Sequence, residues 1–218
     1  MLMYLAHIRP DIIYALSIVS QFMHNLGDQH MNAVMRILRY LKTPPRKGIL
    51  FTKNEYFQSV DAYTNADWAG AVDDRSSTSR YFTFVGGNLV TWRSKKHNVV
   101  SRSSAEDEFR GMTLGVCESL WLRLLRRDLG YLHRQPIKLY CDKKVACHIT
   151  YNQVQHDQTK HVEVDIIFIK EKLVEEIVEL PKIRSEDHLA NIITNAVSSR
   201  VFSKFLGKLA MCDIYAPT

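Results

Sequence analysis

The residues best able to do chemistry in this sequence are acids placed where the expected strands and helices begin or end. Asp142 closes an apolar run, and in sheets covered by helices the carboxyl ends of strands are where sites form. Asn65 and Asp67 share one face of an earlier strand because side chains alternate along it. Glu106 and Glu108 open a long helical segment, where the helix dipole favours anions. Most single acids in such positions cap helices or face solvent, so the set is more informative than any member.

Other common forms of active site are missing from the sequence. No serine, cysteine or threonine stands with a paired base, and neither G-x-x-x-x-G-K-[ST] nor G-x-G-x-x-G occurs. The four cysteines contain no C-x-x-C pair, which favours reduced, mostly buried thiols over a zinc site or a disulfide framework. His156 and His161 are five apart without a nearby cysteine, so surface or capping roles are favoured over metal binding.

The composition is that of a folded protein with a mild positive charge. The 218 residues are 46% hydrophobic and 24% charged, which excludes wholesale disorder. No uncharged run reaches the roughly 20 apolar residues of a membrane span, and the start of the chain lacks the pattern of a secretory signal. We therefore expect an intracellular protein without a membrane partner. Lys and Arg number 29 against 23 Asp and Glu, and the net charge of +6 is compatible with a polyanionic partner.

The first 55 residues predict a basic helical segment. Apolar spacing predicts helices over residues 11–24 and 29–41, and the second ends where prolines and a glycine follow. The apolar face of the second helix is expected at Met31, Val34, Met35, Leu38 and Leu41. If these helices normally pack on a larger body, they would expose apolar side chains when alone, and the candidates are Ile13, Leu16, Met35 and Leu38.

The rest of the chain predicts an α/β fold. Strands are expected at 60–65, 80–85, 88–92, 137–141 and 177–183, and helices at 104–127, 142–151, 162–174 and from 186 onward. Gly86 and Gly87 predict a tight hairpin, and Ser103 with Glu106 predicts a capping box. Trp121 and Leu122 are expected in the core. Three antiparallel strands followed by alternating helices and strands predict a mixed sheet with helices packed on it.

Six ordered motifs carry a resemblance to a known family. They are Tyr63-Thr-Asn-Ala-Asp-Trp-Ala-Gly70, Arg75-Ser-Ser-Thr-Ser79, Ser101-Arg-Ser-Ser-Ala-Glu-Asp-Glu-Phe109, Leu139-Tyr-Cys-Asp142, Thr159-Lys-His-Val-Glu-Val-Asp165 and Arg184-Ser-Glu-Asp-His-Leu-Ala-Asn191. Together they resemble the ribonuclease H (RNase H) domain of copia-type retrotransposon Pol polyproteins, here of a plant element. Tyr4-Leu-Ala-His-Ile-Arg-Pro-Asp11 and Arg36-Ile-Leu-Arg-Tyr-Leu-Lys42 resemble the end of the reverse transcriptase that precedes it.

The resemblance implies both a fold and a domain division. It implies an RNase H-like mixed sheet of five strands, three antiparallel and then two parallel, flanked by helices and preceded by a helical extension. Residues 1–55 would be the remnant of the reverse transcriptase, and residues 56–218 the RNase H-like domain. Because that remnant lacks the catalytic aspartates of a polymerase, no polymerase activity is expected.

The resemblance also implies an endonuclease that cleaves the RNA strand of an RNA–DNA hybrid with two Mg²⁺ (or Mn²⁺) ions. Clustered carboxylates offset the charge of two hard cations that clamp the attacking water and the leaving oxygen. The family's ligand positions fall on Asn65, Glu108, Asp142 and Asn191, and the family carries aspartate at the first and the last. An asparagine offers one carbonyl oxygen and no charge. Weak or absent metal occupancy is therefore expected, with Asp67 as a possible but distant substitute ligand.

The expected partners are an RNA–DNA hybrid and the rest of a reverse transcriptase, in the cytoplasm, a virus-like particle or the nucleus. Candidate residues for nucleic-acid contact are Arg93, Lys95, Lys96 and Lys143. Three hypotheses stay open: an impaired hybrid nuclease, a non-catalytic nucleic-acid-binding module, and an element fragment without a selected role. The sequence assigns no oligomeric state.

Overall fold

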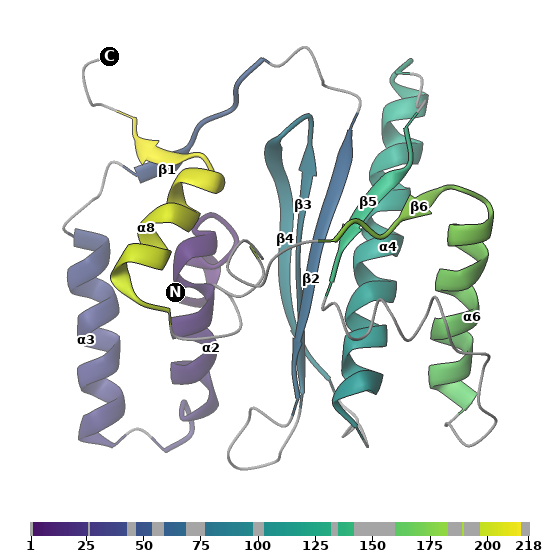
Figure 1. The fold of residues 1–218 in the computed structure, drawn as a ribbon. Coiled ribbons are helices and arrows are strands. Elements are labelled where there is room, and N and C mark those ends of the chain that lie inside the picture. Colours follow the sequence, from purple (N-terminus) through teal and green to yellow (C-terminus); the bar gives the residue numbers. More distant parts are fainter. Residues whose placement is uncertain are drawn as a thin grey trace. The chain divides into compact units, whose positions relative to one another are not determined.

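The computed structural model divides the chain into two compact units (Figure 1). The central unit is Lys53–Ala190, and the terminal unit combines Met1–Thr52 with Asn191–Thr218. The structure describes residues 2–25, 27–42, 47–53, 59–68, 77–97, 103–131, 135–141, 160–182, 189 and 197–214.

A mixed sheet of five strands forms the middle of the central unit. Its strands are β2 (Val60–Asp67), β3 (Thr78–Val85), β4 (Asn88–Lys96), β5 (Ile137–Tyr140) and β6 (Val178–Glu179). Their order is β4-β3-β2-β5-β6; β2, β3 and β4 are antiparallel, whereas β5 lies parallel to both β2 and β6. Gly86 and Gly87 turn the β3–β4 hairpin with positive φ angles of 57° and 78°. The expected RNase H-like fold class, three antiparallel strands and then two parallel, is confirmed.

Two helices, α4 (Ser104–Asp128) and α6 (Lys160–Val174), pack with one face of this sheet. Their buried side chains meet those of β2 and β5 in one core; its members are Val60, Ala62, Phe109, Met112, Val116, Ile137, Leu139, Cys141, Val162, Ile166, Ile169 and Val178. Helix α4 buries a single stripe, so Leu122 is in the interior but Trp121 is 54% exposed. The expectation that Trp121 belongs to the core was wrong, because neighbouring helix positions point about 100° apart.

The start of α4 has the expected cap. The Ser103 hydroxyl oxygen accepts a hydrogen bond from the Glu106 backbone N–H at 3.2 Å. The Glu106 carboxylate accepts from the Arg110 guanidinium, one turn along the helix, at 2.8 Å. Both contacts stabilise the first turns of α4.

The terminal unit contains helices from both ends of the chain. These are α1 (Leu2–Leu5), the 3₁₀ turn η1 (Pro10–Ile12), α2 (Ile13–Gln21), α3 (Asp28–Lys42) and α8 (Ser199–Lys208), together with the short strands β1 (Lys47–Ile49) and β7 (Met211–Asp213). Strands β1 and β7 pair antiparallel in a separate two-stranded sheet. Ile12, Leu16, Val19 and Ile37 form the core between the N-terminal helices.

Several sequence expectations need correction in this unit. The boundary near residue 55 lies close to the division at Thr52, but the C-terminal 28 residues, Asn191–Thr218, group with the N-terminal helices because β7 pairs with β1. Ile13 and Leu16 are buried and not exposed. Met35 and Leu38 are exposed, as expected, and so is Met31. Of the expected apolar face of α3, Val34 and Leu41 pack on the core beside the buried Ile37.

The thiols also differ from expectation. Cys141 is buried, but Cys117 and Cys212 are exposed, and none of the three forms a disulfide. Cys147 lies outside the described residues. Among the described helices, none combines the length and the apolar composition that crossing a bilayer requires.

Candidate active site

The first turns of α4 bring Glu108 beside strand β2. The parallel pairing between β2 and β5 extends as far as Tyr63, which lies opposite Tyr140. Past that pair, the backbone N–H of Ala66 donates to the Glu108 Oε1 atom at 3.2 Å. Glu108 thus lies where the carboxyl end of β5 leaves β2, which is the edge of the sheet where the sequence predicted an acidic site.

Asn65 adjoins the same stretch of backbone. Helix α4 crosses it closely, since a Cβ atom added at Gly111 would lie 3.8 Å from the Asn65 carbonyl oxygen. The structure therefore places the backbone at Asn65 near Glu108, and the family resemblance marks both residues as ligand positions. Only one of the two carries a charge.

Asp67, the possible substitute ligand, is held by an arginine that the sequence analysis missed. Its carboxylate lies 3.6 Å from the guanidinium of Arg80, whose side chain is buried. Arg80 also donates to the Ser94 hydroxyl at 3.2 Å and stands opposite Asn65 in the β2–β3 register. A charged residue inside the apolar run 80–85 is the signal that could have identified it.

A second polar contact links the end of β4 to β3. The ring of His97 lies 2.6 Å from the hydroxyl of Ser79, which is buried, and the His97 backbone N–H donates to the Ser77 carbonyl. Burial lowers the pKa of His97, and the charged groups around it act in both directions: Asp107 and Asp165 raise the pKa, whereas Arg110 and Lys95 lower it. The net result favours the neutral imidazole.

Asp61 lies on the same face of β2 as Asn65, nearer the start of the strand. Burial raises the pKa of its carboxyl group, and the positive charge of Lys138 partly opposes that shift. Between them Tyr63 stacks on Tyr140, with ring centroids 4.4 Å apart. Aromatic rings therefore separate Asp61 from the Asn65–Glu108 edge.

The basic candidates on β4 do not form one surface. Lys95 pairs in register with Ser79 and Arg93 with Tyr81, whereas Lys96 pairs with Thr78 and so points to the other face of the sheet. All three basic side chains are exposed. The Tyr81 hydroxyl donates to Glu118 at 3.1 Å, and burial, together with Glu118, raises the pKa of Tyr81 to about 12.

Three of the sequence candidates, Asp142, Lys143 and Asn191, lie outside the described residues. Within the described part of the chain, no group of three or more His, Cys, Asp or Glu side chains is arranged to hold a metal ion.

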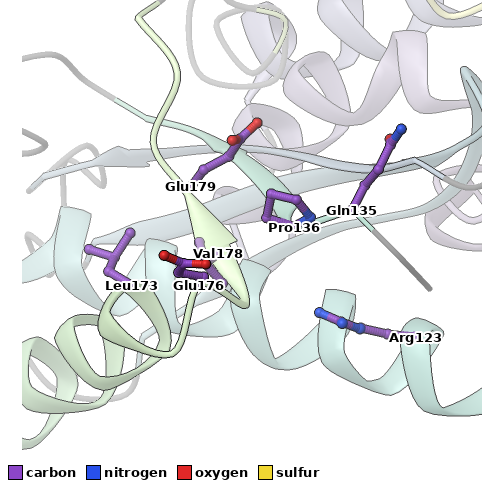
Figure 2. Close-up of a pocket in the computed structure, with 7 residues that line it drawn as sticks. All are labelled: Arg123, Gln135, Pro136, Leu173, Glu176, Val178 and Glu179. Carbon is purple, nitrogen blue, oxygen red and sulfur yellow. The ribbon is translucent and has the colours of Figure 1, made fainter.

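A hollow of about 510 Å³ lies elsewhere in the central unit, at the amino ends of β5 and β6 (Figure 2). Its lining is Arg123, Gln135, Pro136, Leu173, Glu176, Val178 and Glu179. None of these residues is a candidate from the sequence. The Asn65–Glu108 edge is at the carboxyl end of β5, so the hollow and the candidate site lie at opposite ends of that strand.

Comparison with solved structures returned several RNase H proteins. They include the N-terminal RNase H domain of a Mycobacterium tuberculosis protein, with 8% identity, a TM-score of 0.45 and coverage of 68% of this chain and 96% of that one. LC11-RNase H1 in complex with an RNA/DNA hybrid has 12% identity, a TM-score of 0.41 and coverage of 60% and 88%. At these scores the fold assignment rests on the strand order above.

Comparison with curated proteins gives longer matches, although no protein-family model matches the chain. The Pol polyprotein of the Arabidopsis thaliana transposon RE1 is 37% identical over 213 residues, 98% of this chain and 14% of the relative. That of transposon RE2 is 36% identical over 98% of this chain and 15% of the relative. The polyprotein of Nicotiana tabacum transposon TNT 1-94 is 35% identical over 89% of this chain and 14% of the relative. The chain spans about one seventh of the length of these proteins and is similar, over nearly all of its own length, to part of the retrovirus-related Pol polyproteins of plant transposons.

Proposed function

We propose that the central unit is an impaired RNase H-like unit, one that binds RNA–DNA hybrids and hydrolyses the RNA strand weakly or not at all. The observation that carries the proposal is the position of Glu108, whose carboxylate accepts from the Ala66 backbone N–H, one residue after Asn65. The carboxylate of Glu108 is fixed against the backbone next to Asn65, at the sheet edge where the family resemblance implies two acidic ligands. The fold and the polyprotein relatives support the hybrid as the substrate class.

The described donors do not fit a pair of divalent cations. Glu108 brings one negative charge and Asn65 brings a neutral amide oxygen, whereas two hard cations need several anionic oxygens. Asp67 adds little, because its carboxylate is 3.6 Å from the Arg80 guanidinium. If Mg²⁺ or Mn²⁺ were bound, it would supply Lewis-acid activation of water. In this chain Glu108 and Asp142 are the acidic candidates to hold it, and we propose weak occupancy.

Hybrid binding does not require the missing charges. The backbone of a nucleic acid is attracted by exposed Lys and Arg side chains, which β4 supplies on both of its faces as Arg93, Lys95 and Lys96. Lys143 is a further candidate. The proposal includes an intracellular site of action together with the rest of a reverse transcriptase, as the polyprotein context of the relatives implies.

The test restores the two carboxylates. The purified full chain and its Asn65→Asp, Asn191→Asp variant are incubated with a labelled RNA–DNA hybrid and Mg²⁺ or Mn²⁺. A control variant, Asn32→Asp with Asn88→Asp, adds the same charge at positions away from the site. We expect cleavage by the restored variant at least about a hundredfold faster than by the other two chains, the scale of losing important charge stabilisation in an active site. Efficient cleavage by the unmodified chain would refute the impairment.

A binding measurement separates the hybrid-binding module from a fragment without a role. We expect the unmodified chain to bind the hybrid more tightly than duplex DNA of the same sequence, with an affinity that falls as salt rises. Replacing Lys95 and Lys96 by alanine should weaken binding and flatten the salt dependence. Equal binding of both duplexes, unaffected by those substitutions, would favour an element fragment without a selected role.

A further inference from the structure

The C-terminal segment, residues 198–214, is joined by backbone hydrogen bonds to the segment that follows helix α3. Strand β7 pairs with β1 in a defined antiparallel register, with Gly48 opposite Cys212 and Ile49 opposite Met211. The Leu50 backbone N–H extends the pairing by donating to the Ala210 carbonyl oxygen at 2.9 Å. The two strands come from opposite ends of the chain, and the whole central unit lies between them in sequence.

Side-chain burial shows that the contact extends beyond the strands. Phe205 and Leu209 of the C-terminal segment are 1% and 0% exposed. An isolated helix as short as α8 is marginal in water and cannot enclose two such side chains by itself. Part of the covering surface is α3, since the Phe202 ring meets the Tyr40 ring edge-to-face with centroids 6.2 Å apart. Burial of each large apolar side chain is the main favourable contribution to such a contact.

Two backbone features adapt the segment to this position. Ala210 has a φ of 52°, a left-handed conformation that disfavours every residue except glycine, and its carbonyl is the one that accepts from Leu50. Across the pair, a Cβ atom at Gly48 would lie 2.9 Å from Ile214 Cγ2, so glycine lets the end of the segment lie close over β1. The unfavourable turn at Ala210 is offset by the pairing it makes possible.

From these contacts we propose that residues 198–214 are a docking segment whose partner is the surface of β1 and α3, the part of the chain that resembles the end of a reverse transcriptase. Its role is to close the terminal unit, so that the RNase H-like unit is inserted between the two halves of another body. The proposal does not depend on nuclease activity. It means that residues 198–214 stabilise the reverse-transcriptase-like helices.

A disulfide trap tests the register directly in the full chain. Residues directly opposite in an antiparallel pair have Cα atoms within the range that a disulfide spans. In the Gly48→Cys, Ile214→Ala variant, the alanine makes room for the new cysteine side chain. Under mild oxidation we expect this variant to form a disulfide between position 48 and the native Cys212, which peptide mapping would identify. The matched control is Ile49→Cys, whose side chain alternates to the other face. Equal trapping in both variants, or a bond that joins two chains, would overturn the proposal.

Hydrogen exchange tests the role of the segment. Leu209→Ala removes a fully buried side chain from the segment, and Ser203→Ala changes an exposed position of the same segment. For Leu209→Ala we expect amide exchange in α3 and β1 to rise by about thirtyfold or more, while exchange in β2 and β3 stays unchanged. Ser203→Ala should leave both sets unchanged. A rise confined to the central unit, or no rise in α3, would contradict the docking role.

Discussion

Helix α4 lies so close to strand β2 that the interface has no room for one methyl group. A Cβ atom added at Gly115 would overlap the Cγ2 atom of Thr64, a residue with no solvent exposure, and would also touch Leu139. The matched position is Gly111, one turn earlier, where the nearest atom to an added Cβ is the Ser79 hydroxyl oxygen at 3.5 Å. Replacing either glycine by alanine raises helix propensity by about the same amount. The difference between the variants therefore isolates the overlap.

We expect Gly115→Ala to be less stable than Gly111→Ala by about 1–3 kcal/mol, the usual cost of forcing an extra methyl into a packed core. With a urea m-value of about 2 kcal/mol/M, the midpoints should differ by about 0.5–1.5 M. Trp68, Trp92 and Trp121 all belong to the central unit, so tryptophan fluorescence follows its unfolding. Adding Thr64→Ser removes Cγ2 and keeps the hydroxyl, and it should recover most of the loss in a double-mutant cycle. Equal midpoints for the two alanine variants, or no recovery, would refute the close approach.

Two further predictions concern polar groups that are buried in whole or in part. Because folding lowers the pKa of His97, the folded chain holds fewer protons on it than the unfolded chain. This contribution to stability is present above the pKa of histidine in the unfolded chain, near 6.5, and is lost as the pH falls. The His97→Gln variant should therefore show a smaller drop in urea midpoint from pH 7.5 to 5.5 than the unmodified chain. Identical drops would contradict the lowered pKa of His97. In the terminal unit, Asp11 accepts two hydrogen bonds from the buried Arg9 at 2.9 and 2.7 Å and one from Tyr40 at 2.6 Å. Asp11→Ala should destabilise α3 by about 3–5 kcal/mol, because Arg9 would stay buried without its counter-charge. Amide hydrogen exchange in α3 measures this loss, with Asp28→Ala as the surface control. Exchange that is the same in both variants would show that the Arg9–Asp11–Tyr40 hydrogen bonds do not stabilise α3.

The elements with strong local signals could be predicted from the sequence. The Gly86–Gly87 turn, the Ser103 cap and the long apolar repeat of α4 each depend on nearby residues, and all three are found in the structure. Strands β1 and β7 could not be predicted in the same way. Each has three residues, too few to show alternation, and each is a strand because of its distant partner.

For helix α3, the sequence predicts the helix but does not settle which of its faces is buried. Met31, Met35 and Leu38 have helical spacing, but so do Ala33 and Ile37, and periodicity alone cannot choose between two neighbouring apolar stripes. The choice is made by distant residues: the hydrogen bond from Tyr40 to Asp11 turns the Ile37 side of α3 toward the N-terminal core. A part-buried polar contact thus lies on the side of α3 that packs on the core.

In the candidate site, too, some features depend on local sequence and others on distant residues. The family resemblance marks Asn65 and Glu108 as ligand positions of one site, and each residue stands at a fixed point of a strongly patterned element. The sequence could not place Arg80 beside Asp67, because that contact depends on the register of β2 against β3. Register is set by the hairpin and by the buried face together, and a shift of one residue would turn Arg80 to the other side of the sheet.

The residues that hold the fold together are not those that a metal would need. Asn65 and Glu108 are outside the cluster of buried side chains that joins the sheet to α4 and α6. Exchanging a carboxylate for an amide at position 65 therefore removes charge without removing packing, and it also reduces repulsion near Glu108. Under the proposed function, loss of ligands at such an edge would cost little stability, so an RNase H-like sheet could persist without the charges that its chemistry requires. For the same reason, restoring the two aspartates should change cleavage without raising stability. A restored variant that unfolds at a higher urea concentration than the unmodified chain would show that positions 65 and 191 are under structural rather than catalytic constraint.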